Sequence, residues 1–174
     1  FRDEANSNYG TTIVFKTGYT SATGGTIADG SAVIVNANGT VSSVGDTSVT
    51  ESIGSSSVFE SGSMTFTSAT YDSNAQKVVI AYTDNSNSSY GTAVVGTVSG
   101  TSISFGTPVV FESASSANIS ATYDTNAQKV VIAYKDTGNS EYGTAIVGTV
   151  SGTSISFGSA TVFESASTET ISAT

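Results

Sequence analysis

The chain is 174 residues long, has a formal net charge of −9, and contains 37% hydrophobic but only 11% charged residues. Five scattered basic residues cannot follow a nucleic-acid backbone or form a membrane-binding basic patch, and no apolar run is long enough to span a bilayer. Because His and Cys are both absent, imidazole catalysis, disulfides and thiolate metal sites are excluded. We therefore expect no nucleic-acid partner and no membrane insertion.

The first residues of the chain match a stretch that occurs much later. Residues 1–11 have the same spacing of aromatic residues and glycine as residues 134–144. This match predicts that residues 1–16 form the end of a preceding structural repeat.

Residues 17–54 have a different pattern, which we interpret as an inserted β-hairpin module or linker. Two strand-like segments, residues 31–36 and 39–44, flank the stretch Asn36-Ala-Asn-Gly39. The Asn-Gly pair favours the positive φ angles of a tight hairpin turn.

Residues 55–174 contain a long internal repeat. Residues 68–82 return almost unchanged as residues 120–134, 52 residues later. The pattern predicts two regular repeats with boundaries near 65 and 117, and the start of a third repeat at residues 171–174. Repeats of this length are typical of arrays, solenoids and propellers.

Each regular repeat contains four strand-like segments separated by turn residues. In the second regular repeat these are residues 118–123, 129–134, 142–150 and 154–163. The second segment is apolar without alternation, which predicts a strand buried on both faces. The last alternates, with Ile155 and Phe157 on one face, as an edge strand does. The fold class predicted is all-β, with antiparallel four-stranded repeats of about 52 residues that form β-propeller-like blades in an incomplete ring.

Recurrent Asp and Asn residues allow two interpretations. Asp72 and Asn74, and likewise Asp124 and Asn126, bring oxygen ligands close together, as calcium prefers. Alternatively, each Asp accepts hydrogen bonds from the backbone two residues later and forms an Asx turn, which is the interpretation we favour. Calcium is the one cofactor that the sequence leaves open.

Recurrent tyrosines also have two interpretations. Tyr90 and Tyr142 lie beside polar loops that contain Asn87 and Asn139, and these four residues are the candidates for a glycan-binding site. The alternative, which we favour, is that the rings pack at strand ends. The acidic residues recur with the repeat, as structural residues do, so we predict no catalytic residues and a protein that is not an enzyme. A polysaccharide depolymerase is the distant alternative.

The amino-acid sequence of the repeat resembles that of a known group of proteins. Residues 120–124, 129–134 and 142–158 resemble tandem repeats in virion proteins of marine bacteriophages, notably those that infect cyanobacteria, and residues 26–36 and 39–42 resemble the short β module that precedes them. The resemblance implies a structural and adhesive virion component, such as a tail fibre or surface appendage. Its location would be the virion surface, outside the cell. Its partners would be other copies of itself, other virion proteins and glycan on the host surface.

A second class of function fits the same repeat pattern. A secreted bacterial adhesin or filament subunit can be built from the same β repeats, with neighbouring subunits completing its open ends. Near-identical repeats suit a spacer in either class, because each one makes the same contacts with its neighbours.

Overall fold

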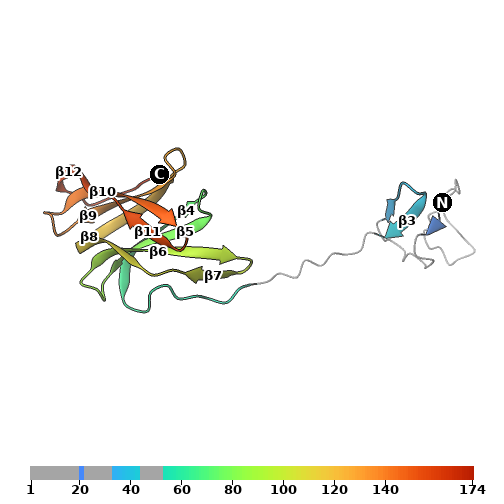
Figure 1. The fold of residues 1–174 in the computed structure, drawn as a ribbon, viewed down its shortest axis with the longest axis horizontal. Coiled ribbons are helices and arrows are strands. Elements are labelled where there is room, and N and C mark those ends of the chain that lie inside the picture. Colours follow the sequence, from blue (N-terminus) through green and yellow to red (C-terminus); the bar gives the residue numbers. More distant parts are fainter. Residues whose placement is uncertain (1–19, 22–32, 44–52) are drawn as a thin grey trace, which may run out of the picture. The chain divides into compact units, whose positions relative to one another are not determined.

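The computed structural model describes residues 20–21, 33–43 and 53–174. These residues form strands, turns and loops without any helix, so the predicted all-β class is confirmed. The chain divides into two compact units, Phe1–Glu51 and Ser52–Thr174 (Figure 1). The predicted end of a preceding repeat, residues 1–16, lies outside the described residues.

The first unit contains a small sheet with strand order β1-β3-β2. Strands β2 (Val33–Val35) and β3 (Thr40–Ser43) are antiparallel and form the predicted hairpin. Gly39 adopts a φ of 78° in the turn, a conformation that glycine tolerates without steric cost. The structure adds a short strand that the sequence did not reveal, since β1 (Thr20–Ser21) pairs with β3 in parallel.

The second unit is built from nine antiparallel strands. They are β4 (Met64–Asp72), β5 (Lys77–Asp84), β6 (Tyr90–Ser99), β7 (Ser102–Phe105), β8 (Val109–Asp124), β9 (Lys129–Asp136), β10 (Tyr142–Ser151), β11 (Ser154–Phe157) and β12 (Thr161–Ser167). The strand order is β11-β10-β9-β8-β6-β5-β4, with β7 also paired to β6 and β12 also paired to β10. Pairing recurs along the chain, because Ser68 lies opposite Ala81 and Ser120 lies opposite Ala133.

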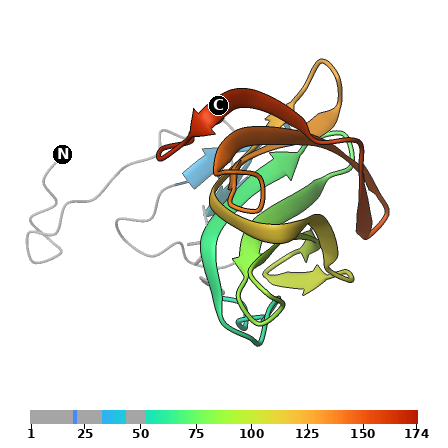
Figure 2. The ribbon, with the colours of Figure 1, turned by 90° about the vertical axis from the view of Figure 1, so that its left-hand side faces the viewer.

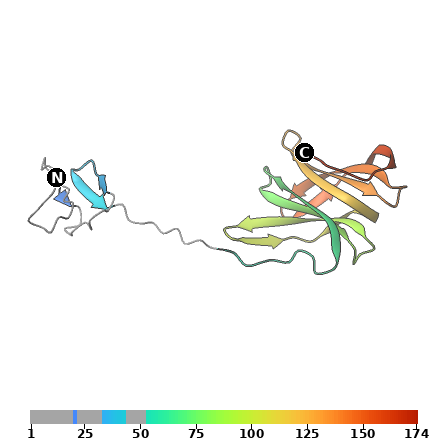
Figure 3. The same ribbon diagram turned by 180° about the vertical axis from the view of Figure 1, so that it is seen from behind.

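Strand β8 belongs to two sheets. Its residues 109–115 pair with β6, and its residues 116–124 pair with β9. The strand runs between the green and the orange strands of the ribbon (Figures 2 and 3). We call β4–β7 with residues 109–115 the first sheet, and residues 116–124 with β9–β12 the second sheet. The predicted strand 118–123 thus begins earlier than expected, because the serine-rich stretch before it has no Gly or Pro to end the extended chain.

The last strand predicted for the second regular repeat, residues 154–163, is divided into β11 and β12. The chain leaves the ladder at Gly158, whose N–H donates to the carbonyl of Val147 at 3.0 Å. Strand β12 then pairs with the first half of β10, whereas β11 pairs with its second half. The alternation expected in β11 is confirmed: Ile155 is buried and Ser154 and Ser156 are exposed.

The two faces of each sheet carry different residues. Strands β5 and β9 point Tyr82 and Tyr134 to one side, which we call the tyrosine face. They point Ala81 and Ala133 to the other side, which we call the alanine face.

The hydrophobic core lies between the alanine face of the first sheet and the tyrosine face of the second. The first sheet contributes Val79, Ala81, Ala93 and Val95, and the second contributes Val130, Ile132, Tyr134, Ile146 and Ile155. Burial of β9 on both faces, as predicted, is therefore wrong: Ile132 is fully buried, but Val131 and Ala133 on the alanine face are only half-buried. The reason is that the second sheet packs against one sheet only within the described residues.

Candidate functional site: the contact between successive sheets

A phenylalanine and a glutamate from the first sheet contact a tyrosine of the second sheet. The ring of Phe111 lies edge-on to Tyr134 with 5.2 Å between centroids, and 5.7 Å from the ring of Phe157. The Tyr134 hydroxyl donates to Oε2 of Glu112 at 3.0 Å. The other carboxylate oxygen of Glu112 accepts a hydrogen bond from the backbone N–H of Ala114 at 3.1 Å. Both oxygens of this carboxylate are thus engaged.

The same contact occurs on the first sheet. Phe59 lies 5.4 Å from Tyr82 and 5.6 Å from Phe105, between ring centroids. The Tyr82 hydroxyl donates to Oε2 of Glu60 at 3.3 Å, and Oε1 of Glu60 accepts from the N–H of Gly62 at 2.6 Å. In both cases the glutamate precedes its tyrosine by 22 residues.

A glycine makes room for each phenylalanine ring of the two successive sheets. A Cβ atom added to Gly91 would lie 2.5 Å from the ring of Phe111, and one added to Gly143 would lie 2.6 Å from the ring of Phe163. In the second sheet this neighbour is a phenylalanine of the same sheet, since β12 with Phe163 pairs with β10.

Burial at this contact raises the pKa values of both tyrosines above their ordinary value of 10.0. Desolvation is the largest cause for each hydroxyl, followed by the nearby carboxylate of Glu60 for Tyr82 and of Glu112 for Tyr134. The phenols therefore stay protonated and act as hydrogen-bond donors at neutral pH.

The third segment with the sequence Val-Phe-Glu-Ser, residues 162–165, has no tyrosine to receive it among the described residues. The side chain of Phe163 is 56% exposed, whereas Phe111 is 8% exposed. The side chain of Glu164 is exposed and makes no hydrogen bond or ion pair within residues 53–174. This segment is chemically identical to residues 58–61 and 110–113 but lacks their contact.

The backbone makes a second set of recurrent bonds between successive repeats. The N–H of Ala121 donates to Oγ of Ser68 at 3.0 Å, and the N–H of Ala173 donates to Oγ of Ser120 at 3.0 Å. Residues 171–174 therefore lie beside the second sheet as residues 119–122 lie beside the first.

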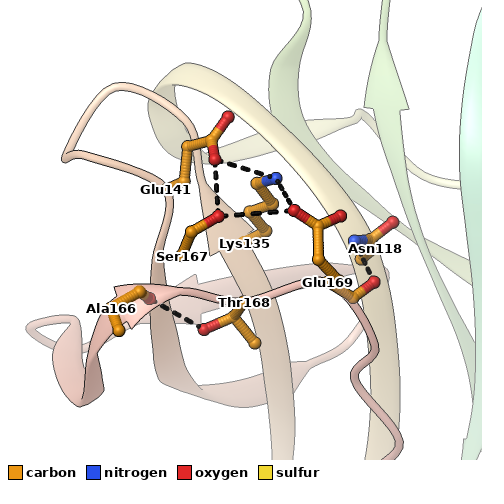
Figure 4. A network of polar contacts seen from close by, with 7 residues as sticks. All are labelled: Asn118, Lys135, Glu141, Ala166, Ser167, Thr168 and Glu169. Atoms are coloured by element: carbon orange, nitrogen blue, oxygen red, sulfur yellow. Dashed lines mark hydrogen bonds and ion pairs between the residues drawn. The ribbon is translucent and has the colours of Figure 1, made fainter.

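A polar cluster holds the C-terminal segment against the second sheet (Figure 4). The Lys135 ammonium is 3.2 Å from Oε2 of Glu141 and 3.1 Å from Oε1 of Glu169. Ser167 donates to Glu141 at 2.6 Å, and the Asn118 amide donates to the Glu169 carbonyl at 2.6 Å. The first sheet lacks this cluster, because Thr83 occupies the place of Lys135 and donates to a backbone carbonyl.

The cluster shifts the pKa values of Lys135 and Glu141 toward the charged forms. The hydrogen bond to Glu169 is the main cause of the raised pKa of Lys135, with Glu141 also contributing. The hydrogen bond from Ser167, followed by that from Lys135, lowers the pKa of Glu141. Lys135 and Glu141 are therefore both charged at neutral pH.

The residues predicted to bind calcium lie in two equivalent turns. Asp72 accepts from the N–H groups of Asn74 and Ala75 through Oδ1 at 3.0 and 2.8 Å. Asp124 accepts from the N–H groups of Asn126 and Ala127 through Oδ1 at 2.8 and 2.9 Å. The predicted Asx turns are confirmed. Among the described residues, no three acidic side chains gather as they would around a metal, and calcium binding stays a prediction.

The residues predicted to bind glycan lie in two equivalent loops. The N–H of Tyr90 donates to the carbonyl of Asn87 at 3.0 Å, and that of Tyr142 to the carbonyl of Asn139 at 3.2 Å. Both asparagine side chains are exposed and both tyrosines are half-buried. Each loop thus brings its own pair together, but on different sheets, and glycan binding stays a prediction.

Sequence reasoning did not identify the Phe-Glu contact or the Lys135 cluster. The signal for the contact was present, since an identical Val-Phe-Glu-Ser segment precedes an identical tyrosine twice at the same spacing. The signal for the cluster was the departure from the repeat at Lys135, Glu141 and Glu169.

The described part of the chain forms no helix that could cross a membrane. No protein-family model matches the chain, and comparison with curated proteins and with solved structures gives no match either.

Proposed function

We propose that the chain is a structural and adhesive component of a bacteriophage virion, part of a tail fibre or surface appendage built from stacked β repeats. In this proposal each sheet corresponds to one β-propeller-like blade, and the array is displayed outside the particle. The proposed role is mechanical: the repeats place a binding surface at a distance from the particle.

One observation carries the proposal: a Phe-Glu segment contacts a tyrosine face twice, once between the two sheets and once between residues 58–61, which form no strand, and the first sheet. Phe59 and Glu60 contact Tyr82 as Phe111 and Glu112 contact Tyr134. A contact that joins different faces can be repeated without limit, as in a spacer. The amino-acid sequence of the repeat resembles repeats of phage virion proteins, and this resemblance favours a virion appendage over other kinds of repeat protein.

The surface of the chain also supports a structural role outside the cell. The net charge of −9 favours solubility, and screening by salt limits the repulsion between neighbouring repeats. The two exposed loops with Asn87 and Asn139 are the places where we expect contact with host-surface glycan.

The proposal is tested by locating the protein on particles. Antibodies raised against residues 53–174 should label, by immunogold electron microscopy, an appendage of phage particles whose genome encodes the chain. Unlabelled particles, together with label on the surface of a producing bacterium, would instead favour a secreted adhesin or filament subunit.

A further inference from the structure

We propose that the alanine face of the second sheet binds the tyrosine face of the first sheet of a second copy of this chain, head to tail. This inference uses the sheet-to-sheet contact on which the proposed function rests, but it concerns the isolated protein in solution. Self-association can therefore fail while the protein is still found on a virion, and the reverse also holds.

The alanine face of the second sheet has apolar residues that no sheet covers within residues 53–174. Val147 is 45% exposed, whereas Val95, the residue 52 positions earlier, is 1% exposed. Val131, Ala133 and Ala145 are likewise half-buried, although their counterparts in the first sheet are fully buried. Because the residue types are the same in both sheets, a tyrosine face is the surface that fits here.

The first sheet offers such a tyrosine face. Tyr71 is 55% exposed and Ile80 is half-buried. Their counterparts in the second sheet lie in the core: Ile132 is fully buried, and Tyr123 packs against the cluster of buried residues. One molecule therefore has a free alanine face and a free tyrosine face, which are the two surfaces that meet in its own core. Because these faces differ, copies that join through them form open chains or rings.

Two segments now lying on these faces have to be exchanged when two copies dock. Residues 58–61, which contact Tyr82, would be replaced by residues 162–165 of the second copy, which have the identical sequence. Residues 172–174, beside Ser120, would be replaced by the identical Ser-Ala-Thr of residues 68–70. Each exchange breaks one set of bonds and remakes the same set, so the newly covered apolar surface drives association.

The Lys135 cluster opposes the exchange. Glu169 fixes the C-terminal segment through its ion pair with Lys135 at 3.1 Å, and the residue that would take its place in the second copy is Thr65. The closed monomer therefore keeps an ion pair that the associated form loses. Removing the Glu169 carboxylate should favour association.

The experiment is sedimentation velocity over a range of concentrations, with four variants of the full chain. Glu169→Ala should associate about threefold more tightly than the parent chain. In that background Val147→Asp should weaken association by more than about 100-fold, because a carboxylate would be buried without a partner. Ile34→Asp, in the small hairpin sheet, is the control and should change nothing, since this side chain is 57% exposed and belongs to the other unit of the chain.

A fourth variant tests the exchange itself. Glu164→Gln in the Glu169→Ala background should weaken association about tenfold. The reason is that the Glu164 carboxylate accepts a hydrogen bond from the Tyr82 hydroxyl of another copy only in the associated form. Its thermal unfolding as a monomer should not change, since the side chain is exposed and unbonded within the described residues.

Two results would overturn the proposal. A Glu169→Ala chain that stays monomeric up to about 1 mM would exclude the head-to-tail contact. Association that is unaffected by Val147→Asp or by Glu164→Gln would assign it to another surface.

Discussion

A single glutamate side chain links each tyrosine face to the segment that lies on it. Glu112 accepts the hydroxyl hydrogen of Tyr134 with one oxygen and a backbone N–H with the other, so its carboxylate is fixed in one orientation. Because the phenol is buried, water does not reach this hydrogen bond, and the bond contributes more to stability than one at the surface. The Phe111 ring covers the phenol edge-on and completes the contact.

Removing the tyrosine hydroxyl should destabilise the second unit of the chain. Tyr134→Phe should lower the free energy of unfolding by about 1.5–3 kcal/mol, because a hydrogen bond to a charged group is lost inside the fold. Urea denaturation measures the change. Glu112→Gln and the double variant complete a cycle whose coupling energy should exceed about 0.5 kcal/mol, and additive effects would show that the two side chains do not interact.

The same tyrosine should make stability depend on pH in alkaline solution. Its folded-state pKa lies above the unfolded value of 10.0, so its contribution is fully present below pH 10 and is lost as pH rises beyond it. Denaturation at pH 8, 10 and 11 should show a steeper loss for the parent chain than for Tyr134→Phe. Tyr71→Phe, at a position 55% exposed, is the matched control and should retain the parent slope.

A strained backbone position predicts a substitution that stabilises the fold. Gln128 has a φ of 56°, as Gln76 has a φ of 55° in the equivalent turn. Glycine adopts this conformation without a Cβ clash, so Gln128→Gly should raise the free energy of unfolding by up to about 1 kcal/mol. Gln128→Val should lower it. A destabilised glycine variant in thermal unfolding would contradict this explanation.

At the scale of elements, the position of a strand in the stack decides which of its faces is buried. Strands β5 and β9 have nearly the same sequence, yet Val79 is buried in β5 whereas its counterpart Val131 is half-buried in β9. The difference arises because the alanine face of the first sheet meets the second sheet, while that of the second sheet meets no further sheet among the described residues. Whether a strand is buried here depends on the sheet that packs against it and not on the sequence of the strand itself.

Equivalent substitutions in the two strands should therefore have unequal costs. Ile132→Asp should abolish folding of the second unit or cost more than about 4 kcal/mol, because Ile132 is fully buried between the two sheets. Ile80→Asp should cost clearly less, because Ile80 is half-buried on the tyrosine face of the first sheet. Circular dichroism with urea denaturation compares the two, and equal costs would mean that the two sheets are buried alike.

The sequence predicted the all-β class, the strands and the turns, but little of the site. Local features could be predicted because they depend on residues that are close together in the sequence. These features are the strands, the Asx turns at Asp72 and Asp124, and the hairpin turn at Gly39. The path of β8 through two sheets did not, because a serine-rich stretch is compatible with either a loop or an extended strand. Partners such as Glu112 and Tyr134 are 22 residues apart, and only the packing of the sheets brings them together.

In the whole molecule, the alanine face of the first sheet stacks on the tyrosine face of the second, so that the contact joins unlike faces. Val147, Phe163 and Glu164 form the part of this contact that no sheet covers within residues 53–174. In a longer array the same residues would be interior, and each added repeat would contribute its own contact to stability. A virion appendage built in this way would be a stiff, regular spacer.

The stability of a longer chain shows whether a further sheet stacks on the second sheet in the same way. The longer chain carries, after Thr174, a second copy of residues 123–174, which continues the repeat in register. Urea denaturation of both chains, each with and without Val147→Asp, compares their free energies of unfolding. We predict that the extended chain is more stable, and that Val147→Asp costs under about 0.5 kcal/mol in the original chain but more than about 3 kcal/mol in the extended one. Separate unfolding of the added repeat, with Val147→Asp harmless in both chains, would show that the added repeat does not stack on the alanine face of the second sheet.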